Sequence, residues 1–162
     1  MSAETFLSSA VEAAIGMAGF AGIVAAIRHR DIAKWEHEER ILLRMLLVAS
    51  GMAITFALLP AVLAEAQLAE STIWRSGSMS LMIWQIGIAA HRSRQFRAGG
   101  KGSPVPRLLY AWVAGIIVLQ ALNVVLGLSW PYLLGVFGIL VNAFIFFLIL
   151  LLGRIGEDDA AA

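Results

Sequence analysis

Residues 131–152 read PYLLGVFGILVNAFIFFLILLL, a run of 22 residues without a charged side chain. About 20 predominantly apolar residues in a helix are needed to cross the hydrocarbon core of a bilayer. Just before the run, residues 128–130 read LSW. Proline cannot continue a preceding helix, and tryptophan favours the boundary between membrane and water. The stretch therefore predicts a membrane-spanning helix that follows a tight turn.

Four further apolar segments precede this one. The chain has 162 residues, of which 60% are hydrophobic and 14% charged, whereas about 25% of the residues of a soluble domain are charged. We therefore expect an all-α fold, an integral membrane bundle of five transmembrane helices that forms a single membrane domain over residues 1–162. The predicted spans are Phe6–Ile27, Ile41–Ala64, Thr72–Ala90, Leu108–Gly127 and Pro131–Leu152.

The basic residues predict the orientation of the bundle. Two connecting segments, residues 28–44 and 91–107, hold ten of the twelve, and Arg154 follows the last span. Five crossings place all three regions on one side and leave Arg75 near the other. Because basic loops face the cytoplasm, we expect an outside N-terminus, a cytoplasmic C-terminus and a bacterial inner-membrane location. The glycine- and proline-rich residues 97–107 should form a flexible inner linker.

The first predicted span is rich in small residues. Gly16, Gly19 and Gly22 recur every three residues, and small residues let helix backbones approach closely in lipid. The pattern fits either a tightly packed helix or subunit interface, or a helix that lines a narrow pathway. Glu12 lies in the same span, and charged groups within membranes usually pair or line water. We predict a Glu12–Arg75 pair, which could be a packing contact or an outer selectivity site.

The other spans carry polar side chains that could join helices or line a permeation pathway. Serines and a glutamine follow Arg75 in the third span, and amides in the last two spans share faces with glycines. Asn142 falls near the middle of the last span, and an amide contact with the fourth span would satisfy it. The candidates are Ser76, Ser80, Gln85, Gln120, Asn123 and Asn142, with Gly135 and Gly138 as helix-packing positions.

No catalytic set is visible in the sequence. The chain contains no cysteine, which excludes disulfides and thiolate chemistry. His29, His37 and His91 lie at the ends of predicted spans; they are weak metal candidates, and their spacing favours solvated loops. We predict that the protein is not an enzyme, has no cofactor and does not bind nucleic acid. The basic inner loops should contact anionic lipid headgroups.

Three motifs carry a resemblance to known proteins. They are AGFAGIVAAIR at residues 18–28, FALLP at residues 56–60, and Trp74-Arg75 followed by Ser76 and Ser78. Over about its first 90 residues the chain resembles small uncharacterised bacterial membrane proteins that share an AGF-x-G-x-V, an L-L-P and a W-R-x-S pattern. The resemblance implies an inner-membrane location and no known activity.

These observations lead to two main hypotheses. The first is a homo-oligomeric channel or passive transport protein for small ions or solutes, with its pathway on a symmetry axis or between protomers. The second is a non-catalytic accessory or scaffold subunit whose polar residues only join helices. A lipid-modifying enzyme is the weakest reading, because no nucleophile–base pair is present.

Overall fold

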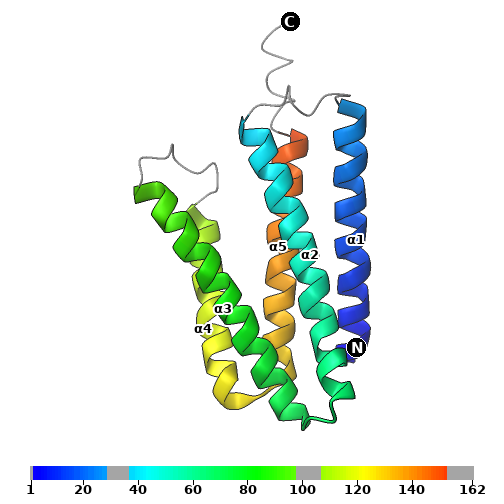
Figure 1. Cartoon of the computed structure of the whole chain (residues 1–162), viewed down its shortest axis with the longest axis vertical. Coiled ribbons are helices and arrows are strands. Elements are labelled where there is room, and N and C mark those ends of the chain that lie inside the picture. The colour runs from blue at the N-terminus through cyan, green and yellow to red at the C-terminus, as the bar shows by residue number, and fades with distance from the viewer. Residues whose placement is uncertain (1, 29–36, 98–106, 153–162) are drawn as a thin grey trace, which may run out of the picture. The chain divides into compact units, whose positions relative to one another are not determined.

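The structure is a computed structural model that describes residues 2–28, 37–97 and 107–152 (Figure 1). All regular structure in these ranges is helical, which confirms the predicted all-α class. The helices are α1 (Ala3–Arg28), α2 (His37–Glu65), α3 (Glu70–Arg97), α4 (Arg107–Leu126) and α5 (Ser129–Leu152).

Three of these helices are long and apolar enough to cross a membrane, counted over the residues described. The segments are Ala3–Ile23, Arg40–Glu65 and Ser129–Leu151. A shorter apolar segment, Ala111–Leu126, belongs to α4, and the polar residues of α3 keep that helix outside the group. This composition supports a helical membrane protein. Five crossings and the orientation of the termini stay predictions.

The helices extend beyond the predicted apolar segments, most clearly in α2 and α3. Helix α3 runs from Glu70 to Arg97, although the expected span was Thr72–Ala90. Helix α2 begins at His37, four residues before the expected start. Arginine, glutamate, glutamine and alanine have high helix propensity, so a helix continues through them after the apolar pattern has ended.

The described chain divides into two compact units, and α2 and α5 contribute to both. The first unit consists of residues 1–57 and 139–162, and the second of residues 58–138. The expectation of one membrane domain stays a prediction.

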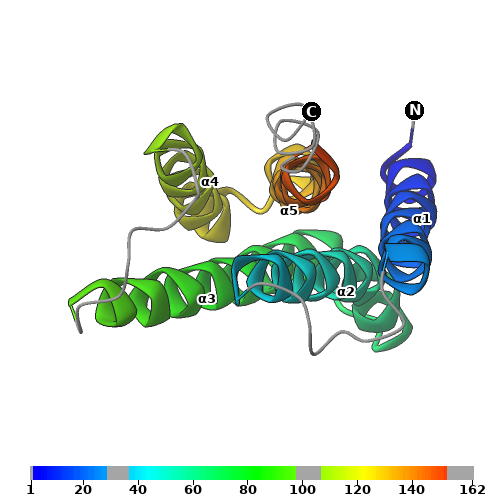
Figure 2. The same ribbon diagram turned by 90° about the horizontal axis from the view of Figure 1, so that it is seen from above.

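The first unit contains α1, most of α2 and the second half of α5 (Figure 2). Phe20 of α1 meets Phe147 of α5 edge to face, with ring centroids 6.1 Å apart. Buried residues in all three segments recur every three or four positions, as expected for one packed face per helix. The core residues are Leu7, Ala10, Ala14, Ala21, Leu42, Leu46, Ala49, Ala53, Phe56, Ala57, Ile139, Ala143, Phe146 and Leu150.

The second unit contains the end of α2, all of α3 and α4, and the first part of α5. Helix α3 packs against α4, and Trp74 of α3 lies 5.7 Å from Tyr132 of α5, measured between ring centroids. Helix α4 ends at Leu126, and the next residue is Gly127, whose amide donates to Asn123 O at 2.8 Å and whose φ is 70°. Glycine adopts this left-handed conformation without a steric penalty, so the chain can turn into α5.

Candidate functional site

The polar residues of α1 face away from the core of the first unit. The buried residues Leu7, Ala10, Ala14 and Ala21 lie on one side of the helix. Successive helical residues rotate by about 100°, so a second set of positions lies on the opposite side. We call these residues the outward stripe, and all of them are exposed: Thr5, Ser8, Glu12, Gly16, Gly19 and Ile23.

The glycines of α1 do not pack against the chain itself. A Cβ atom built on Gly16, Gly19 or Gly22 would meet no atom within 4 Å. Their small size is therefore not required by a neighbouring helix among the residues that the structure describes. This placement gives no support to close packing of α1 within the described chain. It is compatible with the two other interpretations, a subunit interface and a face that lines a pathway.

Glu12 lies on the outward stripe near the middle of the apolar segment Ala3–Ile23. Its side chain is exposed, and it forms no hydrogen bond or ion pair with the described residues of the first unit. Arg75 belongs to the second unit, and the predicted Glu12–Arg75 pair stays a prediction. Glu12 is the only ionisable residue on the stripe.

Arg75 has a neighbour that the sequence analysis missed. A Cβ on Gly127 would lie 2.9 Å from Arg75 Nε and 3.0 Å from Ser71 O, so the guanidinium stem runs beside the end of α4. The C-terminal end of a helix carries a partial negative charge. The positive charge of Arg75 therefore stabilises the C-terminal end of α4, and Gly127, which has no side chain, leaves room for the guanidinium group.

Asn123 joins α3 to the turn between α4 and α5. Its amide nitrogen donates to Ser78 Oγ at 2.8 Å and to Leu128 O at 2.9 Å. Its carbonyl oxygen accepts the Leu128 amide at 2.9 Å. Asn123 is fully buried. Asn142 belongs to the first unit, and its predicted amide contact with the fourth span stays a prediction.

Gln120 makes a second buried contact within the same unit. Its amide nitrogen donates to Pro131 O at 2.7 Å. A Cβ on Gly135 would lie 2.5 Å from Gln120 Nε2, and one on Gly77 would lie 2.7 Å from the Tyr132 ring. A side chain at either position would meet its neighbour too closely, and Gly135 is one of the two glycines predicted as packing positions in the last span.

The remaining polar candidates are not gathered into one site. Ser80 is exposed, and its hydroxyl donates to Ser76 O at 2.9 Å within α3. Buried oxygen atoms without a hydrogen-bond partner occur on Gln85, Gln120 and Asn142. Ser50 Oγ is another such atom, and the sequence analysis missed it because a single serine in an apolar span has no distinctive pattern.

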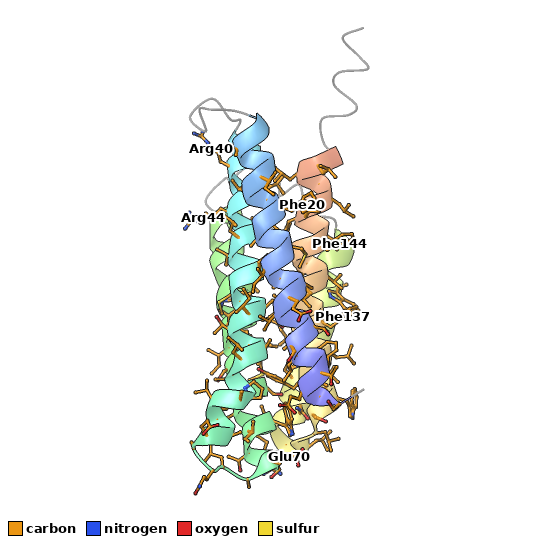
Figure 3. All side chains as sticks on the ribbon, turned by 90° about the vertical axis from the view of Figure 1, so that its right-hand side faces the viewer. Phe20, Arg40, Arg44, Glu70, Phe137 and Phe144 are labelled. Carbon is orange, nitrogen blue, oxygen red and sulfur yellow. The ribbon has the colours of Figure 1, made fainter. Side chains whose placement is uncertain are left out.

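The described residues give no metal centre. No group of three or more histidine, cysteine, aspartate or glutamate side chains that could hold a metal ion occurs among them. His29 and the linker residues 98–106 lie outside the described part of the chain, as do the side chains of His37 and His91. Of the basic residues expected to contact lipid, Arg40 and Arg44 are exposed at the beginning of α2 (Figure 3).

Comparisons with protein families, with curated proteins and with solved structures found no match to this chain. The resemblance described above therefore rests on the quoted motifs. A proposal about function has to start from the geometry of the two units.

Proposed function

We propose that the chain is a multi-pass protein of the bacterial inner membrane that assembles with further copies of itself into a channel for small ions. The observation that carries this proposal is the outward stripe of α1. A polar face exposed to lipid is unfavourable, and such faces normally pair or line water. Copies that bring their stripes together around a common axis would remove these residues from lipid.

The residues of the stripe suit such an assembly. Gly16 and Gly19 allow the backbones of neighbouring α1 helices to approach closely. Glu12 would repeat once per copy around the axis, and rings of carboxylates favour cations in channels. We therefore propose that the permeant ions are cations.

The proposed topology has five crossings, an outside N-terminus and a cytoplasmic C-terminus. Its support is the grouping of basic residues near the ends that α1–α2, α3–α4 and α5 would share. Asn123 and Gln120 satisfy their amide nitrogens inside the second unit. The polar content of α3 and α4 is thus compatible with burial inside a bundle.

The second candidate is an accessory or scaffold subunit. The contacts of Asn123 and Gln120 favour it, because these amides join helices and their nitrogen atoms are used for that purpose. In that case the outward stripe would contact a helix of another protein.

Reconstitution of the full-length protein tests the proposal. We expect an oligomer in lipid nanodiscs and a potassium flux in liposomes that is selective for cations over chloride. Glu12→Gln should lower the cation selectivity several-fold while the oligomeric mass stays the same, because the charge is removed and the shape kept. Glu4→Gln is the matched control, since Glu4 is also exposed on α1 and lies off the stripe.

Two results would contradict the channel. A monomer in nanodiscs would remove the shared axis. An oligomer that carries no ions would leave the accessory role as the better explanation. Unchanged selectivity in Glu12→Gln would reject the role given to the carboxylate.

A further inference from the structure

Two helices pass from one compact unit into the other. The boundary falls between Ala57 and Leu58 in α2 and between Gly138 and Ile139 in α5. Each helix is continuous through its boundary, since α2 runs from His37 to Glu65 and α5 from Ser129 to Leu152.

Pro60 lies three residues after the boundary in α2. A proline inside a helix lacks the amide hydrogen for the bond to the carbonyl four residues earlier, and its ring collides with that carbonyl. Sharp bends in helices occur at such positions. Helix α2 therefore has a weak point close to the place where it leaves the first unit.

Gly138 lies at the boundary in α5, and close packing does not require a glycine there. A Cβ on Gly138 would meet Ile116 at 3.4 Å and Trp112 Nε1 at 3.6 Å, which are ordinary contacts. Gly77 and Gly135 differ, because a Cβ on either would lie 2.7 Å or less from a neighbouring side chain. A glycine in a helix lowers the stability of the helix through its backbone freedom. Gly138 therefore weakens α5 at the boundary, although the packing around it would accept an alanine.

We infer that Pro60 and Gly138 are paired bending points, at which α2 and α5 flex while each unit keeps its internal contacts. The coincidence of a helix-weakening residue with the unit boundary in both crossing helices carries this inference. It does not depend on the proposed channel, and it would hold for an accessory subunit as well.

Distances between spin labels along each helix test the inference in the full-length protein. The chain has no cysteine, so labels can be placed by two substitutions. On α2 the exposed positions Leu47 and Val62 flank Pro60, and a straight helix would hold their backbones about 22 Å apart. On α5 the exposed positions Leu134 and Leu151 flank Gly138, with a straight-helix separation of about 26 Å.

We expect broad distance distributions for both pairs in the wild-type background. Pro60→Ala should narrow the α2 distribution and Gly138→Ala the α5 distribution, each roughly twofold, because an alanine restores a regular helix. Gly51→Ala is the matched control on α2. A Cβ on Gly51 would meet no atom within 4 Å, and Gly51 lies inside the first unit, away from the boundary, so this substitution should leave the α2 width unchanged.

Narrow wild-type distributions would overturn the inference, as would equal narrowing in Gly51→Ala. Amide hydrogen exchange of the unsubstituted protein gives an independent reading. Exchange should be faster near Pro60 than in residues 46–53 of the same helix, and equal protection in the two regions would also overturn the inference.

Discussion

At the scale of single residues, the buried amides show how the second unit holds its polar groups. Both the nitrogen and the oxygen of the Asn123 side-chain amide form hydrogen bonds, and Leu128 contributes both its N–H and its C=O to the contact. The sequence identified Asn123 as a polar candidate that joins helices or lines a permeation pathway. It could not identify Ser78 as the partner on α3, because the two residues are 45 positions apart and only the packing of α3 on α4 brings them together.

Replacement of Asn123 by alanine should destabilise the protein. The change removes the bond to Ser78 and leaves the Leu128 backbone groups without their partner, and we expect a loss of about 2 kcal/mol in the free energy of unfolding. Denaturant titration in mixed micelles would measure it. Ser80→Ala, which removes only a bond within α3, should cost much less, and an equal cost would contradict the assigned role.

At the scale of elements, the lengths of the apolar runs and the positions of helix-breaking residues explain which helices and turns could be predicted from the sequence. The run at residues 131–152 indicated α5, but the turn before it is shorter than predicted. It consists of Gly127 and Leu128, and Pro131 lies in the first turn of α5, where a proline needs no amide hydrogen. The extent of α3 was not predictable from apolar length, since its polar ends also favour helix. The direction of the polar face of α1 was not predictable either, because alanine and glycine lie on all sides of this helix and give no apolar stripe.

The glycine that ends α4 provides a prediction about this element. Gly127→Ala should destabilise the protein by about 1–2 kcal/mol, because an alanine is strained at positive φ and its Cβ would lie 2.9 Å from Arg75 Nε. Thermal unfolding monitored by circular dichroism would measure the effect. Gly115→Ala in the interior of α4 meets no atom within 4 Å, so it should stabilise by about 0.5–1 kcal/mol. A stabilised Gly127→Ala protein would contradict the strained turn.

At the scale of the whole molecule, the question is what covers the outward stripe. The part of the chain described here places no partner on Glu12 and no atom near the α1 glycines. Sequence alone identified Glu12, Gly16 and Gly19 as candidates. Their common orientation became visible only with the packing of Leu7, Ala10, Ala14 and Ala21.

Cross-linking tests whether copies meet at this stripe. A single cysteine at Ser8 should form disulfide-linked dimers in membranes under mild oxidation, because Ser8 is on the stripe and the chain has no other cysteine. A cysteine at Ala13, also exposed on α1 but about 100° around the helix from Glu12, should cross-link several-fold less. Gel electrophoresis without reductant gives the yields, and equal yields would argue against a defined interface.

The bonds between Asn123 and Leu128 also bear on biogenesis. A turn between two membrane helices must cross the hydrocarbon core if the helices insert as a pair, and each unpaired peptide group makes that transfer costly. Here residues 127–130 carry no charge. The side chain of Asn123, on α4, forms hydrogen bonds with both the N–H and the C=O of Leu128. In the proposed topology, helices α4 and α5 would therefore enter the bilayer together as a hairpin, with the peptide groups of Leu128 already hydrogen-bonded during insertion.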